Sequence, residues 1–271
     1  MTRWTLVLLL VALPALSQDY NVPGRPRAAA TTYYSIDLAT NESVEADRVT
    51  VGLANSWSIS IWVKPDALDG ASNMFVLQNA PSGGSNNRRE ILIKPQTAND
   101  PLIVDLFDSA GVEFKRYWYD TVFASATWAH IVVTWDGTTL LTYVNNALET
   151  ADTASPDIAG TQSDATALWT TVGYNHPDGN SWLNGEIGPI GMWTSVLSAA
   201  EVTVINTGKF GFDLSANSGN YTSSANLIHW WKPCQVNDTT ANALQDYKGT
   251  LTLNTNIVNI DTSDCVADAP P

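Results

Sequence analysis

The chain has 271 residues, and 27 acidic residues against 13 basic ones give a formal net charge of −14 at pH 7. A surface with this charge repels phosphate backbones and anionic lipids, which argues against nucleic-acid binding. Only 15% of the residues are charged, whereas 11 are tryptophan, and this balance favours β-structure over helical bundles.

The first 17 residues have the pattern of a secretory signal. Arg3 precedes an apolar run at residues 4–13, and small residues precede a cleavage point before Gln18. The apolar run is too short to span a bilayer, and no other stretch approaches membrane length. We therefore expect a secreted, extracellular protein with no transmembrane segment in its mature chain.

The mature chain is expected to form one domain with a single disulfide. Breaker residues without periodicity predict a flexible leader at 18–31, followed by the domain at 32–265 and a tail at 266–271. Cys234 and Cys265 are the two cysteines of the chain, and an oxidising compartment favours a bond between them. In the chain-entropy model such a bond, closing a loop of about 30 residues, contributes about 3–4 kcal/mol.

Apolar and polar residues alternate with period two in the middle of the domain. At 57–65, Ile59, Ile61 and Val63 share one face, and the segment 128–136 has the same pattern. This alternation predicts antiparallel strands that each turn one face toward a core between two sheets.

Turn-forming residues separate the strands. Asp136 and Asn145 are followed by Gly and Asn, tolerate positive φ, and bracket a strand at 139–144. The other strands and loops expected in the second half are strands at 226–231 and 250–260 and loops at 151–165, 175–184 and 242–249.

One helix is well signalled. Ser198 and Glu201 have the spacing of a capping box, and Gly208 is suitably placed to end the helix.

Four segments together carry a family resemblance. In chain order they read WSISIWVKP at 57–65, REILI at 89–93, WAHIVVTWD at 128–136, and GEIGPIGMW at 185–193 followed by VLS. They resemble strands of the pentraxins and the wider laminin-G-like jelly rolls. The resemblance implies an all-β fold, a two-sheet antiparallel jelly-roll sandwich of the concanavalin A-like type with one short helix.

The resemblance also shows where this chain departs from its relatives. The pentraxin disulfide joins two central strands, at positions that correspond here to Ser60 and Val132. Glucanases with a similar sandwich place three carboxylates on one strand face as E-x-D-x-E, and the aligned residues here are Glu186, Gly188 and Ile190. Because two of the three carboxylates are absent, we expect a protein that is not an enzyme.

Several residues of types that often occur in functional sites are expected to have structural roles instead. His130 lies among apolar strand residues and is expected to be a hydrogen-bonded core histidine. Trp135 and Trp193 are expected in the core for the same reason. Asp246 resembles a residue near structural calcium in some laminin-G-like domains, but without a matched acidic partner it is expected to be a turn or cap residue.

Pentraxins hold two calcium ions, and the resemblance allows at most one here. The first pair of their ligands aligns with Arg88 and Arg89, which cannot coordinate a cation. The second segment keeps Asn175, Asp178 and Asn180 as oxygen donors, which is compatible with one weak calcium site. The alternative is an ordinary Asn/Asp/Pro/Gly turn.

Two groups of residues are candidates for ligand binding. Arg88 and Arg89 form a basic pair that can hold a carboxylate, a sulfate or a uronic acid, or else belong to a solvated loop. Tyr174 and Trp182 flank the loop before the GEIG strand and are candidates for stacking on sugars. On 117–119, alternation directs Trp118 away from the two tyrosines.

The sequence therefore predicts a secreted, non-catalytic module that binds a glycan or another extracellular polymer through loops at one edge or through the concave face. An alternative is a structural subunit that assembles as a homo-oligomer. A third interpretation is an enzyme whose site is built from residues that no motif reveals.

Overall fold

In the computed structural model, the contacts that build the fold lie within Thr32–Pro271. The residues that it describes are 33–39, 42–49, 52, 53, 55–66, 68, 74–81, 88–94, 102–119, 123–162, 168–174, 181–234, 244–249, 251, 253 and 264–271. The predicted signal and leader, at 1–17 and 18–31, lie outside them. In this part of the chain no helix is both long and apolar enough to cross a membrane.

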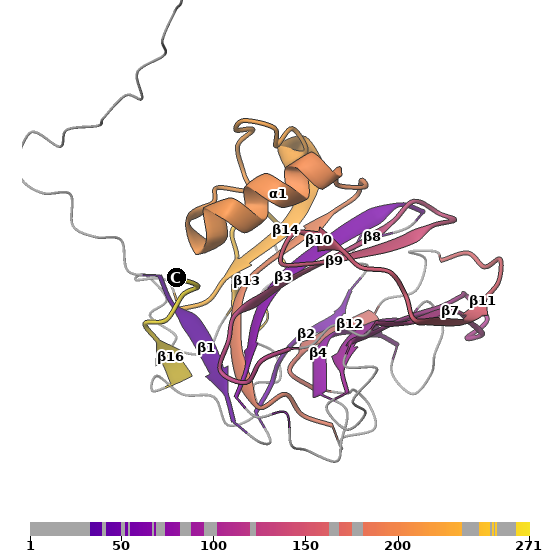
Figure 1. Ribbon diagram of the computed structural model, residues 1–271, viewed down its shortest axis with the longest axis horizontal. Coiled ribbons are helices and arrows are strands. Elements are labelled where there is room, and N and C mark those ends of the chain that lie inside the picture. Colours follow the sequence, from indigo (N-terminus) through magenta and orange to yellow (C-terminus); the bar gives the residue numbers. More distant parts are fainter. Residues whose placement is uncertain are drawn as a thin grey trace, which may run out of the picture. The chain divides into compact units, whose positions relative to one another are not determined.

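Two antiparallel sheets make up the domain (Figure 1). The first sheet has the order β10-β9-β8-β3-β13-β1-β16, with β14 beside β13 and β15 beside β14. Its strands are β1 (Ser35–Leu38), β3 (Trp57–Pro65), β8 (Ala129–Trp135), β9 (Leu140–Val144), β10 (Ala147–Leu148), β13 (Gly185–Trp193), β14 (Leu227–Lys232), β15 (Gln245–Asp246) and β16 (Cys265–Val266).

The second sheet has the order β11-β7-β6-β5-β4-β12-β2. Its strands are β2 (Val44–Val49), β4 (Met74–Ala80), β5 (Arg89–Ile93), β6 (Leu102–Phe107), β7 (Glu113–Tyr119), β11 (Thr153–Asp157) and β12 (Leu168–Val172). The predicted two-sheet jelly roll is therefore confirmed.

The main core lies between the sheets and follows the predicted alternation. Ile59, Ile61 and Val63 of β3 are at most 1% exposed and pack in one cluster with inward residues of the second sheet, such as Ile91 and Val104. The predicted core position of Trp135 is confirmed, since it is 1% exposed in this cluster.

A second apolar cluster covers the outer face of the first sheet. There α1 (Ala199–Gly208) lies on the side away from the second sheet (Figure 1). Trp193 packs against Val202 and Ile205 of the helix, so it is buried as predicted but outside the main core. Trp62, Trp128 and Phe210, which lies in the short 3-10 helix Lys209–Gly211 (η1), form a further cluster.

The capping box of α1 is present, because Ser198 accepts from the backbone N–H of Glu201 and the Glu201 side chain accepts from the backbone N–H of Ser198. Gly208 is the last helical residue and has ordinary φ, whereas Lys209 takes the positive φ of 53° that ends the helix. The stop was therefore predicted within one residue.

Two strands lie where loops were predicted. β11 falls within 151–165 and pairs with β7, and β15 falls within 242–249 and pairs with β14. These short strands are polar and lack alternation, because their stability comes from backbone hydrogen bonds to a neighbouring strand rather than from a buried face. Most of the strand predicted at 250–260 lies outside the described residues.

β13 contains one extra residue. Ile187 pairs with Val63 and Ile190 pairs with Ile61, so three steps along β13 match two along β3. Ile187 and Ile190 both face the core, although strict alternation would place residues three apart on opposite faces of the strand. The extra residue is the reason. Pro189 fits the bulge because it has no backbone N–H that would need a partner.

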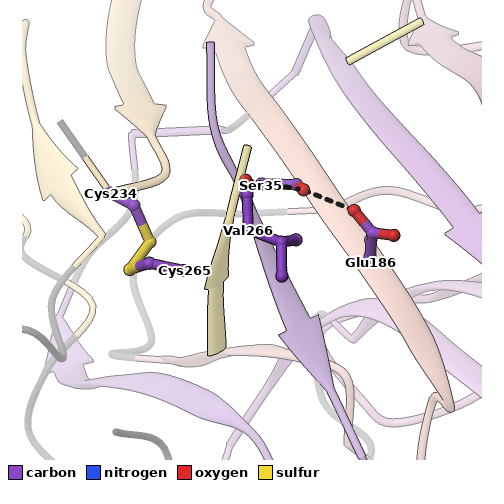
Figure 2. Close-up of a disulfide and its surroundings, with 5 residues drawn as sticks. All are labelled: Ser35, Glu186, Cys234, Cys265 and Val266. Atoms are coloured by element: carbon purple, nitrogen blue, oxygen red, sulfur yellow. Dashed lines mark hydrogen bonds between the residues drawn. A yellow bond between two sulfur atoms is a disulfide. The ribbon is translucent and has the colours of Figure 1, made fainter. Parts of the chain in front are cut away.

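The disulfide between Cys234 and Cys265 is present, with the Cα atoms 5.6 Å apart (Figure 2). It attaches β16 to the end of β14, and β16 pairs with β1 through Ser35 opposite Val266. Figure 2 also shows Ser35 donating a hydrogen bond to Glu186 of β13. Ser60 and Val132, where the resemblance places the pentraxin disulfide, are direct partners across β3 and β8.

The segment predicted as a tail, 266–271, belongs to the domain. Val266 is in β16, Asp268 forms an ion pair with Lys64, and Ala269 packs against the cluster of Trp62, Trp128 and Phe210. The disulfide holds the chain close enough for these contacts to form.

Replacing both cysteines with serine is expected to lower the free energy of unfolding by about 3–4 kcal/mol, because the unfolded chain regains the entropy of a loop of about 30 residues. Urea unfolding with and without reductant measures the change. Reductant should lower the stability of the wild type to that of the variant and leave the variant unaffected. A variant as stable as the oxidised wild type would contradict this prediction.

Candidate functional site

Tyr174 and Trp182 lie side by side where β12 leads into β13. An antiparallel bridge joins the two residues, and their ring centroids are 4.3 Å apart at an angle of 31°. Both side chains are half-buried. Gly173 has a φ of +81°, and its carbonyl accepts from the N–H of Leu183, which fixes the base of this turn. The sequence placed these two aromatics in one loop region, and the structure brings them into contact.

The three candidate calcium ligands, Asn175, Asp178 and Asn180, lie outside the described residues. Within the described residues, no group of three or more His, Cys, Asp or Glu side chains could hold a metal ion. The calcium site therefore stays a prediction.

Arg88 and Arg89 point to opposite sides of the second sheet. The Arg88 guanidinium lies on the outer face, 4.1 Å from the Phe107 ring centroid. Arg89 is only 1% exposed and extends inward, where it donates to the carbonyl of Leu53 and lies 5.6 Å from the Trp57 ring centroid. A surface site that uses both arginines together is wrong, because neighbouring residues at the start of a strand face in opposite directions.

A row of polar side chains crosses the outer face of the second sheet. Gln78, Glu90, Asp105 and Arg116 are cross-strand neighbours on β4, β5, β6 and β7. Arg116 donates to both oxygens of Asp105, at 3.0 and 2.8 Å, and Gln78 donates to Glu90 at 2.6 Å. Arg88 completes the row, with Nε 3.2 Å from the Glu90 carboxylate. We call these five residues the charged row.

Burial raises the pKa values of the two acids in the charged row. Burial raises the pKa of Glu90 to about 7, although Arg88 and Gln78 act in the opposite direction. Burial also raises the pKa of Asp105, against the hydrogen bonds and charge of Arg116. Sequence reasoning missed this pair, and the available signal was a single acid inside each of two mainly apolar strands.

A glycosidase uses a pair of carboxyl groups that reach the bond to be cleaved. The exposure of the acidic side chains to solvent therefore bears on whether they could act in this way. Glu90 is 4% exposed and Asp105 is 1% exposed, and both are held by arginine. Glu186, the one carboxylate retained from the glucanase pattern, is 7% exposed and forms an ion pair with Lys64. These carboxylates are engaged in structural contacts.

The outer face of the second sheet also carries an apolar group. Trp118 packs against Leu92 and Ile103, and Lys94 Nζ lies 5.1 Å from a Trp118 ring centroid. Tyr119 is buried in the main core, where its hydroxyl accepts from Thr142 at 2.8 Å. The prediction that Trp118 points away from the tyrosines is therefore confirmed.

His130 is a core histidine, as predicted. It is fully buried, its Nε2 lies 2.7 Å from the Ser60 hydroxyl, and its Nδ1 lies 3.2 Å from Asn206 Oδ1 of α1. The ring stacks on Trp62 with centroids 4.5 Å apart. Burial lowers the pKa of His130 to about 3, so the ring is neutral and joins the helix to the sheet.

Asp246 organises a turn, which confirms the prediction made for it. Its carboxylate accepts from the backbone N–H groups of Trp230, Lys248, Gly249 and Leu251 and lies 2.6 Å from Nδ1 of His229. Burial alone would raise the pKa of Asp246, but these hydrogen bonds outweigh it and lower the pKa to about 2.

A family comparison agrees with this architecture. The model described as the concanavalin A-like lectin/glucanases superfamily, a laminin-G model, matches residues 38–203. The chain belongs to this superfamily. No curated protein sequence matches the chain.

Solved structures with a similar fold share little sequence with this chain. A Bacteroides ovatus protein, described as a candidate carbohydrate binding protein, is 11% identical, with a TM-score of 0.60 over 89% of this chain and 62% of its own. The native heptameric SAP-like pentraxin of Limulus polyphemus is 12% identical, with a TM-score of 0.49 over 73% of this chain and 91% of its own.

A domain of an arabinanase gives a similar result. Domain 4 of AbnA, an extracellular enzyme of Geobacillus stearothermophilus solved with arabinotriose, is 16% identical, with a TM-score of 0.48 over 65% of this chain and 82% of its own. At 11% identity, the similarity to the Bacteroides ovatus structure concerns the fold alone.

His130 and Glu90 are expected to have opposite effects on stability between pH 6.5 and pH 4.5. As the pH falls, the unfolded state takes up the His130 proton first, which destabilises the fold by up to about 1.4 kcal/mol per pH unit. The folded state takes up the Glu90 proton first, which stabilises the fold over the same interval.

Urea unfolding of His130→Gln and Glu90→Gln across this interval separates the two effects. The stability of His130→Gln should rise on acidification relative to the wild type, and that of Glu90→Gln should fall. The double variant serves as the control, and its stability should change with pH about as much as that of the wild type. Identical slopes for both single variants would contradict the assignment.

Proposed function

We propose that this protein is a secreted, non-catalytic recognition module that binds carbohydrate or another extracellular polymer. Membership of a superfamily of lectins and glucanases supports carbohydrate as the ligand class. The observation that carries the proposal is the half-buried pair of Tyr174 and Trp182, whose rings lie 4.3 Å apart beside the entry to β13.

The aromatic pair suits a sugar ligand for two reasons. A flat ring packs against the C–H face of a sugar, and the polar edges of Tyr and Trp hydrogen-bond to its hydroxyls. The contact between the two rings and the hydrogen bond from Leu183 to Gly173 hold the pair in place before binding, so little conformational entropy is lost on association.

The engaged carboxylates support a non-catalytic role. A retaining mechanism needs one acid that donates a proton and one carboxylate that reaches the sugar. Glu90 and Asp105 are nearly inaccessible and held by arginine, and Glu186 is paired with Lys64.

Secretion is supported by two independent features. The disulfide between Cys234 and Cys265 is of the kind that persists in oxidising compartments. The N-terminal residues 1–17 have the charge and apolar pattern of a secretory signal.

Changing Trp182 to Ala is expected to weaken binding of a cognate glycan by about tenfold or more, because a stacking surface is lost. The ligand comes from a glycan array or polysaccharide pull-down with residues 18–271, and calorimetry measures the affinity. Trp118→Ala, which removes a half-buried tryptophan from the outer face of the second sheet, is the matched control and should bind as the wild type. Absence of glycan binding with and without calcium would refute the proposal.

One weak calcium site in the loop with Asn175, Asp178 and Asn180 is part of the proposal, since these side chains offer the oxygen donors that calcium prefers. Calorimetric titration of the mature protein with calcium is expected to give heat of binding that Asp178→Ala abolishes. Asp152→Ala, in a different loop, is the control. Equal heat from the wild type and Asp178→Ala would exclude this loop as the site.

A further inference from the structure

The edge of β13 opposite β3 is shared by two strands that leave a gap between them. β1 pairs with Gly185, Glu186 and Ile187, and β14 pairs with β13 from Ile190 onward. The bulge at Gly188 and Pro189 therefore lies where β1 begins and β14 ends. Figure 1 shows these strands beside β13.

Residues of four segments meet at this gap and line a shallow hollow that is open to solvent. Tyr33 and Tyr34 precede β1, Pro189 lies in the bulge, Phe210 comes from η1, and Lys232 is the last residue of β14. We call it the Pro189 hollow. Its lining residues are one phenylalanine, one proline, two tyrosines and one lysine, so apolar walls are combined with a few residues that carry polar groups, as in many ligand sites.

Lys232 has no acidic partner in the described part of the chain. Its Nζ lies 3.7 Å from a Trp230 ring centroid and 5.1 Å from that of Tyr247, and no described carboxylate oxygen comes within 4.0 Å of it. The side chain is half-buried, and burial lowers the pKa of Lys232 while the charge of Asp213 acts in the opposite direction. An ammonium group that is partly desolvated without an ion pair gains more from a bound anion than an exposed one does.

The charges around the hollow define the ligand further. Asp213 accepts hydrogen bonds from the backbone and side chain of Ser215 at 2.9 and 2.6 Å, so its carboxylate already has partners. Lys209 lines a neighbouring hollow that also contacts Pro189 and adds a second positive charge. A single anionic group therefore finds local attraction on a protein whose formal net charge is −14.

We propose that the Pro189 hollow binds the carboxylate of an acidic sugar such as a uronic acid. Lys232 pairs with the carboxylate, the phenol groups of Tyr33 and Tyr34 hydrogen-bond to the sugar, and Phe210 contacts its C–H groups. This site is separate from the Tyr174 and Trp182 pair and does not depend on it. It also places acid recognition at Lys232 instead of at the Arg88 and Arg89 pair that the structure separates.

Titration of the mature protein with glucuronate, followed by NMR chemical shifts and calorimetry, tests the proposal, with glucose as the neutral probe. Glucuronate is expected to shift the resonances of Tyr33, Tyr34 and Phe210, and glucose to leave them unchanged. Lys232→Met keeps the apolar stem over Trp230 and should weaken glucuronate binding by about tenfold or more, since a charge-assisted contact is lost.

Two further variants keep the test specific. Lys232→Arg retains the charge and should retain binding even if Lys232→Met unfolds. Lys248→Met removes an exposed lysine that does not line the hollow and should bind glucuronate as the wild type does. The proposal is overturned if glucuronate does not bind, if glucose shifts the same resonances equally, or if Lys248→Met weakens binding as much as Lys232→Met. Trp182→Ala should leave glucuronate binding unchanged, so failure here is distinguishable from failure of the proposed function.

Discussion

The extra residue in β13 is the constraint on which the first sheet depends. β13 pairs with β3 on one side, while β1 and β14 divide the other. The bulge lets Ile187 and Ile190 both face the core and turns Gly188 toward Phe210 and Trp62, where a Cβ would lie only 2.2 Å from the Phe210 ring. A regular strand could not satisfy these contacts together, because each residue added to a strand moves the following side chains to the other face.

The two sheets cover their outer faces by different means. The first sheet is covered by α1 and η1; apolar outward residues such as Trp193 and Val132 pack beneath α1, and His130 hydrogen-bonds to Asn206 of the helix. The second sheet instead carries the charged row, in which hydrogen bonds to Asp105 and Glu90 compensate for much of the cost of burying them. The side-chain contacts of these two acids link β4 to β5 and β6 to β7.

Both proposed binding sites lie at places where strands end. The Tyr174 and Trp182 pair lies between the end of β12 and the start of β13, and the Pro189 hollow lies between the start of β1 and the end of β14. At such places backbone pairing stops and side chains from separate segments meet, so a ligand site can vary without disturbing the core. The disulfide and β16 fix the start of β1 and so help to place Tyr33 and Tyr34.

The sequence by itself determined the fold class, the central strands, the capped helix, the disulfide and the buried roles of His130 and Trp135, since these follow from local periodicity, capping chemistry and the pairing of two cysteines. Tertiary structure decided which face each side chain occupies beyond those strands. It placed Arg88 and Arg89 on opposite faces, made Glu90 and Asp105 cross-strand neighbours, and brought Lys232 and Tyr33 to the same hollow although most of the domain's sequence separates them. Such contacts depend on strand order and on one extra residue in β13, and neither leaves a periodic signal in the sequence.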